Sequence, residues 1–147
     1  METTVDLGVV GFEAAPGWNF FPMDRRVIAR PHNRVGVFTI TVEHREAVVF
    51  PASHEMCMRA AKAAAGIDAE GPGADRARDQ LVACLAGGES FRVGADFLRL
   101  WYHHCPAGLI VGWFSCPAGR EQEQLVKELI KDCERMILSL YLPPPVA

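Results

Sequence analysis

The pattern that most constrains the fold is an amphipathic segment near the C-terminus. Its apolar side chains recur at spacings of three and four, and they are Leu125, Val126, Leu129, Ile130, Cys133, Met136, Ile137 and Leu140. This period places one apolar stripe along a helix, with charged residues such as Glu128 on the opposite side. A stripe of this length needs an apolar surface to cover it. The sequence therefore predicts a closing helix that packs on a sheet and is essential to stability.

The segments before this helix have the alternating pattern of strands. In residues 36–44, Phe38, Ile40 and Val42 alternate with mostly polar residues, so they share one face of a strand. An N-terminal hairpin is expected from the strand-favouring residues 5–12, a turn at 14–17 and the aromatic run that follows.

Three further extended segments follow Gly88, at residues 90–93, 97–104 and 109–116. The short connections between them contain glycine, and the second also contains Pro106, which suits tight turns. These segments predict an antiparallel meander.

Two helices are expected between the long strand and the meander. Ser53 can cap the first, which should run from His54 to about Gly66. The second is expected to begin at Pro72 to Gly73, with Gly87-Gly88 as its stop. Its expected apolar stripe consists of Leu81, Val82 and Leu85.

These elements predict an α+β fold with an antiparallel β-sheet of about five to seven strands flanked by helices. The helices are not interleaved with every strand, which excludes a doubly wound parallel sheet. A length of 147 residues suits a single domain. We expect that domain to span residues 1–142, followed by a short Pro-rich tail at 143–147.

Charge and composition narrow the classes of partner. The chain has 15 Lys and Arg against 18 Asp and Glu, a formal net charge of −3, so no broad field favours nucleic acid. One local excess of positive charge is interpreted as a solvated strand edge, and its members are Arg25, Arg26, Arg30, His32 and Arg34. Without a signal-like N-terminus or a long apolar run, the sequence predicts a cytoplasmic protein without membrane insertion.

The five cysteines do not suggest a disulfide framework. Their number is odd and no secretory signal accompanies them, so we expect all five to be unpaired. They are Cys57, Cys84, Cys105, Cys116 and Cys133. Cys57, Cys84 and Cys133 are expected to be buried and slow to react.

No motif for catalysis, phosphate binding or dinucleotide binding occurs in the chain. His103-His104-Cys105 is the one cluster of potential metal ligands, but adjacent strand residues point to opposite faces, so the two histidines are poorly placed to share an ion. We expect no catalytic residues, no metal and no cofactor. A Cys/His-dependent or metal-dependent enzyme using His103 or His104 stays open as an alternative.

The aromatic residues of the meander indicate a binding surface. On the strand at 97–104, Trp101 shares a face with Phe97, Arg99 and His103, while the other face is also partly apolar. If helices cover one face only, a strip around Trp101 and Trp113 is exposed or lines a groove. Phe97, Arg99, Trp101 and Trp113 are therefore the predicted partner surface.

The order of elements resembles the Mog1/PsbP-like α/β/α sandwich. The stretches that carry the likeness are Ala15-Pro16-Gly17-Trp18, Arg30-Pro31, residues 36–41, Ser53-His54-Glu55, residues 98–102, residues 109–116 and residues 137–140. The resemblance implies a non-enzymatic role, since relatives of that fold act as regulators of a small GTPase, extrinsic photosynthetic subunits or small bacterial chaperones. The function predicted from the sequence is thus a non-catalytic protein-binding module, such as a small bacterial chaperone or adaptor. A homodimeric structural protein with no small-molecule site is the milder alternative.

Overall fold

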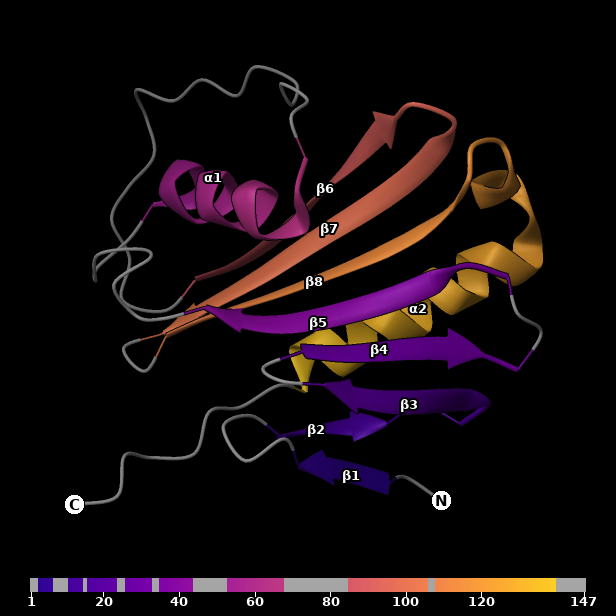
Figure 1. The fold of residues 1–147 in the computed structure, drawn as a ribbon, viewed down its shortest axis with the longest axis horizontal. Coiled ribbons are helices and arrows are strands. Elements are labelled where there is room, and N and C mark those ends of the chain that lie inside the picture. Colours follow the sequence, from indigo (N-terminus) through magenta and orange to yellow (C-terminus); the bar gives the residue numbers. More distant parts are fainter. Residues whose placement is uncertain are drawn as a thin grey trace.

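The computed structural model describes residues 3–6, 11–14, 16–23, 26–32, 35–43, 53–67, 85–105 and 108–139. Six of the described strands form one antiparallel sheet in the order β3-β4-β5-β8-β7-β6 (Figure 1). Their bounds are β3 (Trp18–Met23), β4 (Arg26–Pro31), β5 (Val37–Glu43), β6 (Leu85–Val93), β7 (Asp96–Cys105) and β8 (Gly108–Pro117). Two further strands, β1 (Thr3–Asp6) and β2 (Gly11–Ala14), pair with each other in a separate small sheet.

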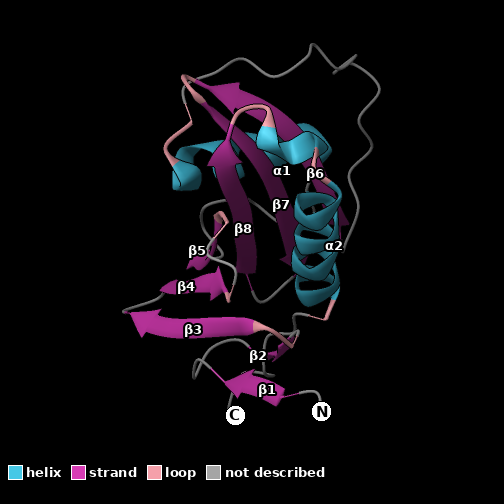
Figure 2. Ribbon diagram, turned by 90° about the vertical axis from the view of Figure 1, so that its right-hand side faces the viewer, coloured by secondary structure: helices cyan, strands magenta, loops and turns pink. Residues whose placement is uncertain are grey.

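Two helices lie on opposite sides of the six-stranded sheet (Figure 2). Helix α1 (His54–Ala65) packs on the face formed by β6, β7 and β8, and helix α2 (Gln124–Leu138) packs on the other face after a 3₁₀ turn, η3 (Arg120–Gln122). The chain is therefore an α+β domain with an antiparallel sheet, as the sequence predicts. The core on the α2 side includes Phe38, Ile40, Ile110, Phe114, Val126, Leu129, Cys133, Met136 and Ile137.

Local sequence signals explain where α1 begins and ends. The hydroxyl of Ser53 accepts a hydrogen bond from the Met56 amide at 3.2 Å, so the predicted N-cap is confirmed. Gly66 ends the helix with a φ of 71°, a left-handed conformation that glycine adopts without steric cost. The buried residues of this helix are Cys57, Met58 and Ala61.

Helix α2 confirms the predicted stripe with one correction, and Leu140, its last expected member, lies outside the described residues. Leu129 and Ile137 are buried and Glu128 is exposed, as the spacing predicts. Leu125, which the spacing also assigns to the stripe, is 47% exposed. It lies in the first turn, where the neighbouring Val126 takes the buried position instead.

The prediction that Gly87-Gly88 ends a helix is wrong, because both residues lie inside strand β6. A Cβ on Gly87 would lie 3.0 Å from the Tyr102 hydroxyl, and a Cβ on Gly88 would lie 2.9 Å from Cδ1 of Trp101. Successive strand residues point to opposite faces, so each glycine makes room for a large side chain on one face. Leu85, expected on the apolar stripe of that helix, is instead the first residue of β6, and the other two expected stripe residues, Leu81 and Val82, lie outside the described residues.

The predicted N-terminal hairpin has the wrong partners. Strand β2 pairs with β1, whereas β3 pairs with β4 in the register Trp18↔Pro31 to Met23↔Arg26. Trp18 explains the position of β3, because its ring is buried on the α2 side and its Nε1–H donates to Asp132 of α2 at 3.2 Å. This contact draws β3 into the large sheet beside β4. The meander of β6, β7 and β8 is confirmed.

Candidate functional site

The predicted partner surface is not one continuous strip. Trp101 is only 3% exposed and its ring meets Phe38 edge to face, with centroids 5.9 Å apart, in the core beneath α2. Trp113 pairs with Leu100 and therefore points to the opposite face, towards the α1 side. The expectation that Trp101 and Trp113 share an exposed strip is wrong, since α2 covers the face that carries Trp101.

The other two residues of that expected surface accompany Trp101. Phe97 is half-buried and packs against the α2-side core. The Arg99 guanidinium lies 5.7 Å from the centre of the Trp101 ring, and its Nη1 donates to the Ser90 hydroxyl at 3.3 Å. Arg99 thus lies beside a buried ring on the α2 side, whereas Trp113 is half-buried on the opposite face.

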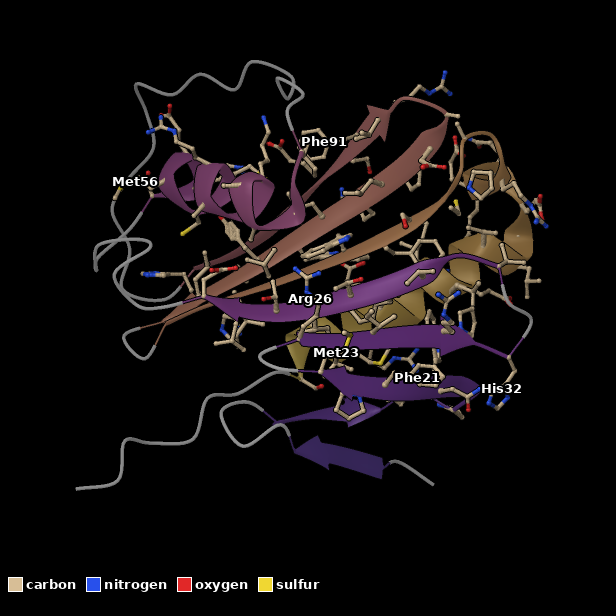
Figure 3. The ribbon with its side chains drawn as sticks, viewed as in Figure 1. Phe21, Met23, Arg26, His32, Met56 and Phe91 are labelled. Carbon is tan, nitrogen blue, oxygen red and sulfur yellow. The ribbon has the colours of Figure 1, made fainter. Side chains whose placement is uncertain are left out.

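An uncovered area lies on the α1 side of the sheet, over strands β3, β4 and β5. Figure 3 shows Phe21, Met23 and Arg26 on this part of the sheet. Phe21 is 51% exposed and Met23 is 60% exposed, and both are among the exposed large apolar residues of the described chain. Among the described helices, α1 contacts β6, β7 and β8, and α2 lies behind the sheet. The face over β3 and β4 therefore stays open within the described structure.

The strand register shows how this area is built. One row runs from Phe21 through Ile28 and Thr39 to Trp113, and the next row runs from Met23 through Arg26 to Thr41. Alternation along β4 places Arg30 on the same face as Arg26 and Ile28. We call this surface the open face and define it by Phe21, Met23, Arg26, Ile28, Arg30 and Trp113.

The charge of the open face differs from that of the whole chain. The Arg26 guanidinium lies 5.7 Å from the centre of the Trp113 ring, a cation–π geometry that holds the arginine against the sheet. Arg26 and Arg30 are both exposed, and neither forms an ion pair with a described residue. Glu43 is an acidic residue on the same face, beyond Thr41 at the Arg26 end. Two of the arginines that the sequence suggested for a strand edge therefore stand on a sheet face beside apolar side chains.

A second polar constellation joins α1 to the covered half of the sheet. The hydroxyl of the buried Tyr102 lies 2.6 Å from Nδ1 of His54, the first residue of α1. Nε2 of His54 lies 3.3 Å from a carboxylate oxygen of Glu89 on β6. Because a carboxylate only accepts, a neutral His54 would donate a hydrogen bond from Nε2–H to Glu89 and accept one at Nδ1 from the Tyr102 hydroxyl. Both ring nitrogens are therefore engaged within the protein, and the network fixes the start of α1 on the sheet.

The sequence does not reveal this network, because its three members come from separate elements. His54 follows the N-cap, Tyr102 lies in mid-strand on β7, and Glu89 lies on the edge strand β6. The local signal that accompanies it is Gly87, whose missing side chain leaves the space that Tyr102 and His54 fill.

The described cysteines are buried thiols, and the described histidines and cysteines form no cluster that could hold a metal ion. Cys57, Cys116 and Cys133 are free, as the sequence predicts, and the expected burial of Cys57 and Cys133 is confirmed. Cys116 is buried as well, whereas Cys84 and the Cys105 side chain lie outside the described residues. Burial raises the pKa of Cys57 to about 11 and the pKa of Cys133 well above its ordinary value, so both favour the unreactive thiol. No group of three or more His, Cys, Asp or Glu in the described part of the chain could hold a metal ion.

His103 and His104 take different positions, as strand geometry requires. His104 is buried on the α1 side, while His103 is half-buried on the face of Trp101. Burial, and then the charge of His104, lower the pKa of His103 below its ordinary value.

Among the described residues, no helix is long and apolar enough to cross a membrane.

Comparison with known proteins identifies the fold and no family. No family model matches the chain, and no curated protein matches its sequence. A solved structure of a protein from Bacteroides thetaiotaomicron VPI-5482 superposes with a TM-score of 0.50 over 97% of this chain at 12% sequence identity. The chain spans about half, 48%, of the length of that protein. At this identity the likeness concerns the fold alone.

Proposed function

We propose that this chain is a non-catalytic protein-binding module whose partner docks on the open face. The observation that carries the proposal is the pair Phe21 and Met23, which are 51% and 60% exposed on a sheet face that α1 covers only in part. Exposed apolar residues that form one patch mark interaction sites more often than scattered ones do.

The composition of the open face suits a protein partner. Aromatic residues, methionine and arginine are enriched in protein interfaces, and Phe21, Met23, Arg26 and Trp113 supply all three kinds. The unbranched side chain of methionine adapts to irregular partner surfaces. Arg26 stacks on Trp113, and this pair lies between the open face and α1.

Within this proposal the chain acts as a cytoplasmic chaperone or adaptor. The resemblance to the Mog1/PsbP-like sandwich supports such a role, because relatives of that fold bind other proteins. The rival enzyme has less support, since the raised pKa values of Cys57 and Cys133 disfavour the thiolate that a cysteine nucleophile needs. A homodimer that uses the open face is the remaining alternative, and the experiment below distinguishes it.

Site-specific photo-cross-linking in the native host tests the proposal. The photoreactive amino acid p-benzoylphenylalanine replaces Met23 in one variant and Leu125 in a control variant. Leu125 is a matched position because it is also apolar and 47% exposed, but it lies on α2 behind the sheet. We expect a covalent adduct with one heterologous protein from position 23 and none from position 125.

Two results would count against the proposal. The same adducts from both positions would show that contact is non-specific. A position-23 adduct that contains only a second copy of this chain would support the homodimer instead.

A further inference from the structure

We propose that the occupant of the open face is an acidic, amphipathic helix of the partner, lying beside α1 as a second helix over the sheet. This inference rests on the proposed function and specifies the chemistry of the partner. It is drawn from three features of the open face: its position next to α1, its apolar rows and its two arginines without an ion pair among the described residues.

The position of α1 favours a helix as the occupant. The rows of the open face continue across the sheet into residues that α1 covers, since Trp113 pairs with Leu100 and Thr41 pairs with Val111. Helix α1 therefore forms a helical layer over one half of this face, and no described helix covers the other half of it (Figure 1). Neighbouring helices pack about 8–10 Å apart, so a second helix beside α1 would lie over β4 and β5.

The apolar residues fit one stripe of such a helix. Phe21, Ile28 and Trp113 lie in one row across the sheet, and Met23 lies in the next. Along the strands, the open face from Asn19 to Met23 is about 13 Å long. A helix of about 12 residues spans about 18 Å, which is enough to cover it with anchors at spacings of three, four and seven.

The charge of the open face favours acidic residues on that helix. Arg26 and Arg30 stand four residues apart on one face of β4, so their backbones are about 13 Å apart. Two carboxylates seven residues apart on a helix lie about 10 Å apart on the same side, within reach of two flexible arginines. Glu43 stands near the Arg26 end and would disfavour further acidic residues there.

The same charges argue against a second copy as the occupant. A twofold dimer brings identical patches together, so Arg26 and Arg30 of both copies would enter one interface. Like charges in an interface are destabilising, and the formal charge of −3 makes the arginine patch a local exception in an acidic chain.

The test uses a designed 16-residue peptide as the probe. It has leucines at positions i, i+3, i+4 and i+7 and two glutamates seven residues apart beside the leucine stripe. A matched peptide carries lysines in place of the two glutamates. Binding to the full chain is measured by fluorescence anisotropy at low salt, where surface charges are least screened.

We expect the glutamate peptide to bind the wild-type chain about tenfold more tightly than the lysine peptide, because two exposed ion pairs replace two repulsions. The variant with Arg26→Glu and Arg30→Glu should reverse this order. A variant with Arg26→Gln and Arg30→Gln should bind both peptides equally, and it provides the comparison if the charge-reversed chain does not fold. Circular dichroism checks the fold of each variant.

Equal affinity of the wild-type chain for the two peptides, or no binding of the glutamate peptide, would overturn the inference. Self-association that the glutamate peptide does not displace would also overturn it, in favour of a second copy. The proposed function is tested separately. If position 23 forms an adduct with a heterologous protein but the two peptides bind equally well, the chain is a protein-binding module whose partner is not an acidic helix.

Discussion

The hydroxyl of Tyr102 lies 2.6 Å from Nδ1 of His54, and this contact joins the middle of the sheet to the first residue of α1. Tyr102 is fully buried, so its hydroxyl depends on partners inside the protein.

We expect Tyr102→Phe to lower the free energy of unfolding by about 1–2 kcal/mol, because it removes one hydrogen bond and takes the proton donor away from His54. Guanidinium denaturation of Tyr102→Phe, His54→Ala and the double variant measures the coupling between the two side chains. Strictly additive effects in this cycle would contradict a direct interaction.

Close approach of α2 to the sheet depends on Gly112. A Cβ at this position would lie 2.4 Å from Cδ1 of Ile137 and 3.2 Å from Cε1 of Phe38. We expect Gly112→Ala to destabilise the fold by about 1–3 kcal/mol through overpacking. The addition of Ile137→Val removes the clashing Cδ1 and should restore part of the loss. If Ile137→Val instead worsens the Gly112→Ala variant by its full separate cost, the assigned contact is incorrect.

The buried face of α2 gives a third prediction about stability. Leu129→Ala and Ile137→Ala should each cost about 2–5 kcal/mol, because both truncate side chains in the core. Glu128→Ala and Leu125→Ala, at exposed positions, should each change the free energy of unfolding by about 0.5 kcal/mol or less. The midpoints of chemical denaturation measure these changes. Similar losses of stability at all four positions would contradict this orientation of the helix.

Much of the architecture could be predicted from the sequence because its signals are local. The stripe of α2 and the Ser53 cap depend on residues a few positions apart, and the meander depends on alternation and turn residues. The role of Gly87-Gly88 is not evident from the sequence, because it depends on Tyr102 and Trp101, which lie on the neighbouring strand.

The candidate site was harder to predict for the same reason. Trp101 and Trp113 differ in exposure because α2 and α1 cover different halves of the sheet, and no local pattern states which half a helix covers. The register places Phe21 beside Ile28 and Met23 beside Arg26, outside the area that α1 contacts, and no local pattern in the sequence shows this pairing.

The lowered pKa of His103 predicts how stability depends on pH. The unfolded chain binds a proton near pH 6.5, whereas the folded chain binds it only at lower pH, because burial and the charge of His104 oppose protonation. Between the lowered pKa and 6.5 the unfolded state holds more protons, so the free energy of unfolding falls as the pH falls through this range. In thermal unfolding, the His103→Gln variant should lose less free energy of unfolding than the wild type as the pH falls over that range. If the free energy of unfolding depends on pH equally in both proteins, other groups cause the effect.

The central claim, that a protein partner binds the open face, is tested most directly by the affinity of the partner that position 23 captures. Its dissociation constant is measured for the wild-type chain, for the variant with Phe21→Ser and Met23→Ser, and for Leu125→Ser, which removes an equally exposed apolar side chain from α2. We predict that the double variant binds at least about tenfold more weakly, since two interface anchors are lost, and that Leu125→Ser binds as the wild type does. Equal affinity of the double variant and the wild type, with both folded, would contradict the claim.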